Sequence, residues 1–432
     1  MIEGEDLKKA FIFFYLVLAG VFAFGQEVSE KQEIAVFNLS YYDWKVPSGA
    51  LGLVDEEIKD IFINIGRFDV LGMNYRLGSG DINEFIDKIR EVKEESIEIP
   101  ESVRLGQEAF TEADFNALIG SFIVVIPSVV SFRAGRTESG AYRADIKTSF
   151  TFINIDELKS FAYFTVDTIG LDDRSIRDAV EEAASDISVQ LTYEIRKMPV
   201  FQLKSGIIDV LGQDVLIEFG ADMGVKKGDE YVITRTRVLD SGHKVTEEKG
   251  LLVIKEVREN VSIAKIIWVE GNAVIGDQVR EVPRIGTDTT MYVHAAVGLT
   301  EAERSAVMLG ARQSVSRGMY RFRPIFGLEF PLVINGLIGF PMNLFAGGEL
   351  NWYFRRMQAV PLVTGGVGGV YDPNSSSFII TNWGFKTGVF LNFLVSKSTR
   401  IGLEGGYTYW FGTSNGYNYG GPYGGLVVLV KY

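Results

Sequence analysis

The sequence lacks cysteine and contains only two histidines, His243 and His294. The absence of cysteine excludes disulfides, thiolate metal sites and a lipid-modified cysteine. The histidines have no ligand spacing to each other, and nothing around them supports a histidine-based catalytic triad. We therefore expect no metal or other cofactor, and we expect that the protein is not an enzyme.

The chain also lacks an excess of positive charge, because its 432 residues carry a formal net charge of −13. A surface that binds nucleic acid must be basic to neutralise phosphates, so nucleic acid is not an expected partner. Phe and Tyr are abundant, with 30 and 18 residues, while proline is modest, with 11. This composition favours an ordered protein that is rich in strands.

Long hydrophobic runs are scarce, and the clearest one covers residues 10–25. Two lysines precede it, and Ala23 and Gly25 are small residues placed for cleavage before Gln26. The pattern predicts a secretory signal peptide at residues 1–25, with an uncleaved inner-membrane anchor as the alternative. Because no later run could form a membrane helix, any further membrane contact must come from strands.

Residues 26–199 alternate predicted strands and helices, which indicates an α/β (α+β) domain. The predicted strands are residues 33–39, 67–73, 121–132, 142–153 and 160–168. Apolar residues at helical spacing predict a helix at residues 50–65 and one long helix that ends near Ile195. Asp172 and Asp173 stand where the cap of that long helix is expected.

Three short motifs of this domain are Ile34-Ala35-Val36-Phe37, Gly66-Arg67-Phe68-Asp69-Val70 and Leu118-Ile119-Gly120-Ser121-Phe122. With the helix after the first motif, they resemble the periplasmic domain shared by the curli secretion channel family and the TolB N-terminal domain. The resemblance implies a periplasmic location and a role in envelope machinery. The chain lacks the lipoprotein cysteine of the curli family and an added pore hairpin, so we do not expect a secretion pore in this domain.

Residues 200–284 have the pattern of a small, barrel-like all-β domain, in which Gly and Asp turns separate short strands. Two of these turns carry Gly224, Lys226, Gly228, Asp229, Gly276 and Asp277. Their order resembles the C-terminal domain of the flagellar assembly protein T family, which implies a setting in flagellar or secretion-related assembly. Such turns are also common in small SH3-like barrels, so plain turn geometry without a ligand is the alternative.

Residues 285–432 alternate apolar with small or charged residues at period two, which predicts an eight-stranded antiparallel transmembrane β-barrel. The predicted strands are residues 289–299, 306–315, 319–330, 343–354, 358–371, 378–395, 399–411 and 420–432. Short basic turns alternate with longer connections. An even strand count puts the first and last residues of the barrel on the same, periplasmic side. The pattern resembles the small OmpA-like barrel family, and Tyr432 resembles the C-terminal aromatic sorting signal of such barrels.

Charged residues on the face opposite the aromatic residues are expected to point into the barrel. They are Arg321, Arg323, Glu329, Glu349, Lys386, Arg400 and Glu404. Side chains fill the lumen of an eight-stranded barrel, so a paired charge network is expected rather than a solute pore. His294 is expected in the lumen, and Trp352, Trp383 and Trp410 are expected in the interfacial girdles. Arg312 and Gln313 interrupt the apolar face of the second strand and make it the weakest.

One glycine-rich segment, Gly365-Gly366-Val367-Gly368-Gly369, looks like a phosphate loop. It lies within a predicted strand, and no helix follows it. The dinucleotide interpretation therefore fails, and small residues at a bend of the barrel explain the segment better.

Together these patterns predict a non-enzymatic scaffold that a barrel anchors in the bacterial outer membrane. Two periplasmic domains would present a surface for the assembly of envelope machinery. The expected partners are outer-membrane lipid and periplasmic or envelope proteins, and a homo-oligomer is left open. The alternatives are an adhesin or binding protein that acts through barrel loops such as residues 412–425, a narrow channel and, last, an envelope enzyme.

Overall fold

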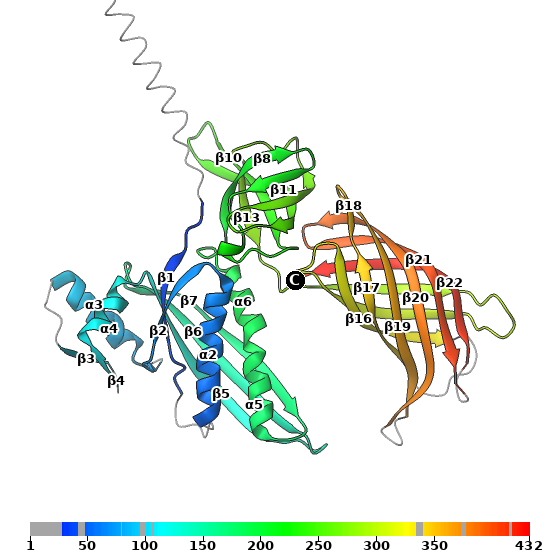
Figure 1. Cartoon of the computed structure of the whole chain (residues 1–432), viewed down its shortest axis with the longest axis horizontal. Coiled ribbons are helices and arrows are strands. Elements are labelled where there is room, and N and C mark those ends of the chain that lie inside the picture. The colour runs from blue at the N-terminus through cyan, green and yellow to red at the C-terminus, as the bar shows by residue number, and fades with distance from the viewer. Residues whose placement is uncertain are drawn as a thin grey trace, which may run out of the picture.

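The computed structural model describes residues 28–41, 48–78, 80–95, 101–105, 108–333, 340–372, 377–413 and 417–432. The predicted signal peptide lies outside these residues. Within the described ranges, no helix is long and apolar enough to cross a membrane. Three successive parts of the chain form three structures, which we call the N-terminal unit (32–197), the small barrel (204–282) and the C-terminal sheet (287–431) (Figure 1).

The N-terminal unit is built on a five-stranded sheet with the strand order β2-β1-β5-β6-β7. Its strands are β1 (Gln32–Phe37), β2 (Phe68–Met73), β5 (Ile123–Arg136), β6 (Tyr142–Asn154) and β7 (Lys159–Asp172). β1 is parallel to both β2 and β5, whereas β5, β6 and β7 pair antiparallel. Residues 34–37 of β1 are all buried, because the sheet is covered on both faces at this point.

Helices cover the two faces of this sheet. They are α2 (Ser48–Ile65), α3 (Ile82–Glu95), α4 (Glu112–Gly120), α5 (Ile176–Ser185) and α6 (Ile187–Lys197). α2 and α6 pack on the face of Ile34 and Val36, while α3 and α4 pack on the face of Ala35 and Phe37. A hairpin of β3 (Ser102–Leu105) and β4 (Glu108–Thr111) also packs on the second face, and the sequence did not predict it.

The structure corrects the long helix that was expected after β7. Two helices replace it, because Asp186 ends α5 and begins α6. The cap of α5 is also not Asp172 or Asp173. It is Ser175, whose hydroxyl oxygen accepts a hydrogen bond from the backbone N–H of Asp178 at 3.1 Å.

The small barrel is a closed sheet with the order β10-β11-β12-β9-β8-β13. Its strands are β8 (Lys204–Leu211), β9 (Asp214–Ile217), β10 (Glu230–Val238), β11 (Lys244–Val257), β12 (Ser262–Val269) and β13 (Gln278–Val282), with the short helix η1 (Ala221–Met223) between β9 and β10. Ile207, Tyr231, Ile233, Leu252 and Ile254 are fully buried in its core. The small barrel therefore has an apolar core of its own.

The C-terminal sheet is antiparallel, and each strand pairs with its neighbours in the sequence. Its strands are β14 (Thr287–Ala296), β15 (Ala306–Val315), β16 (Phe322–Val333), β17 (Phe340–Leu350), β18 (Trp352–Phe354), β19 (Met357–Asp372), β20 (Ser377–Ser396), β21 (Thr399–Gly412) and β22 (Tyr419–Lys431). β18 continues β17 after a break at Asn351, and both pair with β19. Because β14 also pairs with β22, the described strands close into a ring of eight when β17 and β18 are taken as one interrupted strand.

The two faces of this ring have opposite chemistry. Large apolar side chains such as Phe322, Phe354, Leu403 and Leu426 are 55–65% exposed on the outside. Charged side chains such as Glu404 are buried inside. A water-soluble protein normally shows the reverse distribution.

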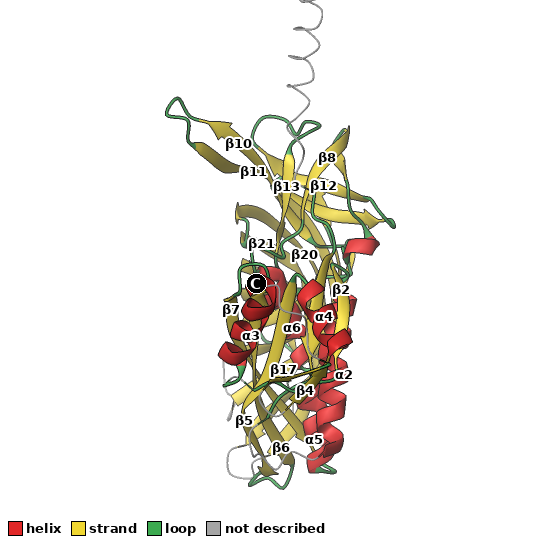
Figure 2. Cartoon of the chain, turned by 90° about the vertical axis from the view of Figure 1, so that its left-hand side faces the viewer, coloured by secondary structure: helices red, strands yellow, loops and turns green. Residues whose placement is uncertain are grey.

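One turn of the small barrel meets both neighbours, which extend from it toward the same side (Figures 1 and 2). Gly224 has a φ of 72°, and a Cβ there would lie 1.7 Å from the carbonyl oxygen of Ile65 at the end of α2. Gly228 has a φ of 84°, and a Cβ there would lie 2.1 Å from the carbonyl oxygen of Ser316 in the β15–β16 connection. Only glycine permits both the backbone conformation and these close approaches.

We predict that Gly224→Ala weakens the contact between the small barrel and α2. Gly212→Ala is the matched control, because Gly212 has a φ of 70° but no atom within 4 Å of the added Cβ. Each variant should lose about 1–2 kcal/mol to the left-handed conformation. Gly224→Ala should in addition speed hydrogen exchange at the end of α2, near Ile65. Equal exchange rates there in the two variants would contradict the contact.

Candidate functional site: a buried charged joint between the three units

A chain of ion pairs joins the N-terminal unit to the small barrel. Arg67 Nη1 lies 2.7 Å from Glu281 Oε2, and Arg196 Nε lies 2.6 Å from Glu281 Oε1. Arg196 Nη2 also lies 3.1 Å from Asp229 Oδ1. Arg317, from the connection before β16, reaches the same Asp229 oxygen at 3.0 Å and adds the C-terminal sheet to the chain.

A second chain of ion pairs joins the small barrel to the base of the C-terminal sheet. Glu230 accepts from Arg284 Nη2 at 2.9 Å and from Lys431 Nζ at 2.7 Å. Lys431 Nζ lies 3.4 Å from Asp288 Oδ2, which also pairs with Arg323 Nη1 at 2.7 Å. Two consecutive residues at the start of β10 therefore join the two series of ion pairs, since Asp229 belongs to the first series and Glu230 to the second.

These charged side chains form one cluster, which we call the joint. Its members are Arg67, Arg196, Asp229, Glu230, Glu281, Arg284, Asp288, Arg317, Arg323 and Lys431. Arg196 Nη1 connects the two chains by donating to the carbonyl oxygen of Arg284 at 3.1 Å. Most members are almost completely buried, so each charge depends on its partners for compensation.

Local folding explains how the joint is positioned. α2 ends at Ile65, and Gly66 turns the chain with a φ of 81°, so that Arg67 stands directly before β2. Arg67 Nη1 also donates to the carbonyl oxygen of Phe201 at 2.6 Å, in the segment that leads into the small barrel. Arg196 stands in the last turn of α6. Both arginines are therefore at the ends of helices that pack on the same sheet face.

The carboxylates of the joint are held in the ionised form. Burial by itself would raise the pKa of Glu281, but Arg196 and Arg67 outweigh it and lower the pKa from 4.5 to about 2. Burial has the same effect on Glu230, where Lys431 and Arg284 outweigh it and also lower the pKa to about 2. The opposing charges therefore dominate over desolvation at both carboxylates.

The turn residues singled out in the sequence enter the joint unequally. Gly224, Gly228 and Gly276 all have positive φ, as tight turns require. Asp229 closes its turn by accepting from the backbone N–H of Lys226 at 2.9 Å, while its other oxygen serves the joint. The Lys226 side chain is exposed. Asp277 accepts from the N–H of Val274 and pairs with Lys249, so it stabilises the small barrel alone.

Six of the seven expected lumen charges lie inside the C-terminal sheet, and Arg321 does not. Arg321 is exposed and precedes β16, which begins at Phe322, so the strand alternation does not apply to it. Arg323 belongs to the joint, as described above. Glu329 pairs with Lys386, and Glu349 accepts from Asn351 Nδ2 at 3.3 Å.

The interior network also contains Arg312, which the sequence pattern presented only as an interruption of the second strand. Glu404 Oε2 lies 2.7 Å from Arg312 Nη1, so the arginine that interrupts the apolar pattern of β15 is an internal partner. His294 is buried 3.8 Å from Glu404 Oε1. Arg400 donates to Asn392 Oδ1 at 3.2 Å. Strict alternation along the predicted strand 306–315 would have placed Arg312 inside the ring.

The expected aromatic girdle needs one correction. Trp352 and Trp383 are 47% and 56% exposed on the outer face, but Trp410 is 2% exposed and stacks on Tyr419 inside the ring. Tyr432 follows β22 and is half exposed, and its carbonyl oxygen accepts from the N–H of Ile285 at 2.8 Å. The first and last strands of the sheet therefore meet beside the joint.

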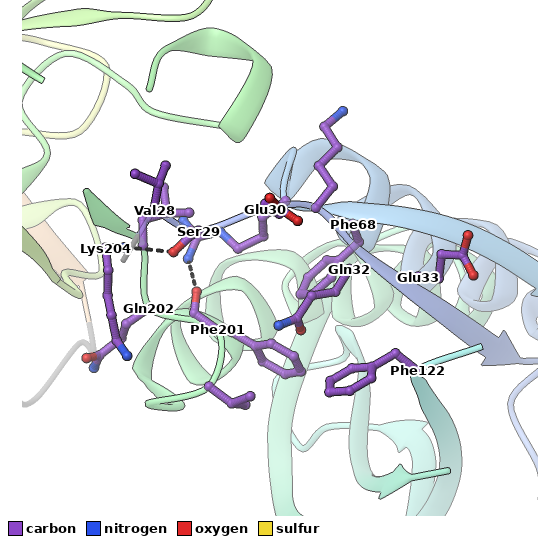
Figure 3. A pocket seen from close by; sticks show the side chains of 14 residues that line it. Val28, Ser29, Glu30, Gln32, Glu33, Phe68, Phe122, Phe201, Gln202 and Lys204 are labelled. Carbon is purple, nitrogen blue, oxygen red and sulfur yellow. Dashed lines mark hydrogen bonds between the residues drawn. The ribbon is translucent and has the colours of Figure 1, made fainter. Parts of the chain in front are cut away.

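A pocket of about 630 Å³ lies beside Arg67, between residues 28–33 and residues 200–204. Figure 3 shows the rings of Phe68, Phe122 and Phe201 at this pocket. Ser29 and Lys204 exchange hydrogen bonds there, at 2.9 Å to the Lys204 carbonyl and 2.8 Å to the Ser29 hydroxyl. The pocket therefore lies where residues 28–33 pass from the small barrel to β1 of the N-terminal unit.

Among the residues that the structure describes, no group of three or more His, Asp or Glu side chains is placed to hold a metal ion. His243 is exposed in the connection between β10 and β11, where Nδ1 contacts the Ser241 hydroxyl at 3.0 Å. Residues 365–369 lie within β19 and pair with strands on both sides, so they form no phosphate loop.

Comparisons with known proteins leave the family open. No protein-family model and no curated protein matches the chain. The PelC dodecamer from Paraburkholderia phytofirmans is 11% identical over 38% of this chain and 90% of its own, with a TM-score of 0.23. Lipoprotein GNA1162 from Neisseria meningitidis is 10% identical over 37% and 97%, with a TM-score of 0.21. Neisserial surface protein A is 15% identical over 34% and 96%, with a TM-score of 0.24. Scores this low carry no argument about function.

We predict that Glu281→Gln loosens the joint, because buried Arg67 loses its counter-charge and buried Arg196 keeps only that of Asp229. The loss should be about 3–5 kcal/mol. Glu91→Gln is the matched control, since Glu91 forms an exposed pair with Lys88 that contributes at most about 1 kcal/mol. Hydrogen exchange at Leu203, whose N–H donates to Glu281 Oε2 at 3.2 Å, reports on the joint directly. Protection at Leu203 that is unchanged in Glu281→Gln would contradict this role.

The lowered pKa of Glu281 also predicts a pH dependence. A carboxylate whose pKa falls from 4.5 to about 2 on folding contributes stability that is complete above pH 4.5. This contribution is lost as the pH falls toward about 2. Protection at Leu203 should therefore decrease over this range in the unaltered protein. The Glu281→Gln variant should lack that part of the pH dependence.

We predict that Glu404→Leu hinders folding of the C-terminal sheet, because Arg312 is left buried without its partner. The cost should be about 3–5 kcal/mol. Glu301→Leu, at an exposed position of the β14–β15 connection, is the control. Heat-modifiable migration on gels measures the folded fraction. Migration of Glu404→Leu that equals that of the control would count against an interior network.

Proposed function

We propose that this protein is a non-enzymatic scaffold anchored in a bacterial outer membrane. In this proposal the C-terminal sheet spans the membrane as an eight-stranded β-barrel. The small barrel stands at its periplasmic end, and both N-terminal parts belong to the periplasm, where they present a surface for envelope machinery. Because the N-terminal unit extends toward the same side as the C-terminal sheet, this placement requires the joint to hold it at an angle that keeps it out of the bilayer (Figures 1 and 2). The observation that carries the proposal is the joint, which fixes both units to the base of the anchor.

The inside-out chemistry of the C-terminal sheet supports the membrane anchor. Its outer face is apolar and its interior holds ion pairs such as Arg312–Glu404, the distribution found in membrane barrels. At the joint end, β18–β19 and β20–β21 are joined by two residues each, and the longer β15–β16 connection contacts the small barrel. Gly318 N–H donates to the Lys227 carbonyl at 2.7 Å, and Lys397 Nζ pairs with Glu248 at 3.0 Å. The base of the anchor is thus the side occupied by the other units.

The joint favours a scaffold over the two alternative functions. An adhesin that acts through barrel loops needs no buried ion network at the opposite end of the barrel. A channel needs an open lumen, but ion pairs and aromatic side chains fill the described interior. A scaffold that must hold a partner at a fixed position relative to the membrane has a use for a rigid joint.

The outer edge of β7 is the best candidate for the assembly surface. In the described part of the sheet, β7 pairs with β6 on one side and with no strand on the other. Tyr163, Ile169 and Leu171 of this strand are 49–62% exposed. A long edge strand with apolar side chains offers a template for strand pairing with another protein. The template excludes the Leu171 N–H and the Asp167 carbonyl oxygen, which are bonded to Glu182 of α5 and Gln190 of α6. The expected partner is a protein of the envelope machinery to which the curli, TolB and flagellar resemblances point, and a second copy of the chain is the alternative.

Complementation of a deletion strain tests the scaffold directly. We expect the deletion to impair motility, secretion or envelope integrity, and the Glu281→Gln variant to fail in restoring it. Glu91→Gln and a variant with a shortened loop at residues 412–418 should both restore it. If Glu281→Gln, present at normal abundance, fully restores the deletion strain while the loop variant fails to, the adhesin is favoured instead. Normal behaviour of the deletion strain would remove the basis of the assembly role.

A further inference from the structure

A cleft of about 840 Å³ lies where the small barrel meets the outer face of the C-terminal sheet. The β8–β9 turn and the β12–β13 connection of the small barrel form one wall. The tight turn between β18 and β19, which contains Arg355 and Arg356, forms the other. Trp268 lies between the walls, and the Arg356 guanidinium stands over its ring at 5.0 Å.

The charges that line the cleft have one sign. Arg355 and Arg356 line it, and no Asp or Glu does. Both arginines are exposed, and neither has a carboxylate partner among the residues that the structure describes. This differs from the joint nearby, where each arginine contacts a carboxylate or a carbonyl oxygen. The cleft therefore offers two guanidinium groups to an anion from outside the chain.

The rest of the lining is apolar and continues onto the outer face of the sheet. Phe354, Met357 and Phe393 are 48–61% exposed there, and they lie on the band that the proposed function places in lipid. Val274 and the neighbouring Ile275 of the small barrel are 45% and 64% exposed on the opposite wall. A ligand of this cleft must combine an anionic group with a large apolar part.

We infer that this cleft binds a glycerophospholipid of the periplasmic leaflet. Its phosphate lies between Arg355 and Arg356, and its acyl chains run along Phe354 and Phe393. This inference rests on the proposed membrane anchor, because only that anchor brings the apolar band into a bilayer. A bound lipid would hold the small barrel against the membrane surface and so add a second support to the joint. Aromatic and basic residues commonly occupy this interfacial level.

Binding of dihexanoyl phosphatidylglycerol to the full-length protein in detergent tests the inference. The change in tryptophan fluorescence, to which Trp268 contributes, reports binding. Arg355→Gln/Arg356→Gln should weaken the affinity on the order of tenfold. Arg174→Gln/Arg177→Gln is the control, because it removes the same charge at the start of α5, at side chains that are 78% and 73% exposed. The control should bind as the unaltered protein does.

Two further measurements keep the outcomes distinct. Heat-modifiable migration shows whether the double variant is folded, and flotation with phosphatidylglycerol vesicles shows whether the sheet inserts into a bilayer. Equal affinity in the folded double variant and its control, or no binding by the unaltered protein, would overturn the lipid site. Failure of the unaltered protein to float would overturn the membrane anchor instead, whatever the detergent titration shows.

Discussion

The carboxylate of Glu281 is the constraint on which the arrangement of the units depends. It is buried between Arg67 of one helix end and Arg196 of another. Without it Arg67 would have no carboxylate partner, and Arg196 would keep only Asp229. Separating the units would leave these charges without partners, so the contact is stable only when complete. The same logic extends through Asp229 and Glu230 to the base of the C-terminal sheet, which makes the small barrel a connector rather than an independent module.

Individual residues of the joint could be singled out from the sequence, but the joint itself could not be predicted. Positive φ and turn chemistry are local properties, so the sequence indicates the glycines of the 223–229 turn and the Gly66-Arg67 motif. Their contact was not visible, since Glu281 lies 214 residues from Arg67 and 85 from Arg196. No spacing rule connects residues so far apart. The break at Asp186 was missed for a related reason, because the apolar stripe continues across it.

In the C-terminal sheet, period-two alternation located most interior charges because each strand presents one face to the lumen. It was wrong for Arg321, because the strand was predicted to begin at residue 319 whereas β16 begins at Phe322. Trp410 was assigned to the girdle by residue type, although it has the same parity as the interior Glu404. Arg312 was discounted as an interruption. Its partner Glu404 lies in a different strand, β21, so the sequence of β15 alone does not show that the charge of Arg312 is compensated.

The proposed anchor places a demand on the joint. The N-terminal unit and the C-terminal sheet extend from the small barrel toward the same side, so the joint must hold the charged face of α5 clear of lipid (Figures 1 and 2). Because the chain has no cysteine, spin labels at Val189→Cys of α6 and Val395→Cys of β20 can measure this geometry. We predict a single narrow distance distribution that is the same in detergent and in lipid nanodiscs. A broad distribution, or a shift on transfer to the bilayer, would contradict a rigid joint.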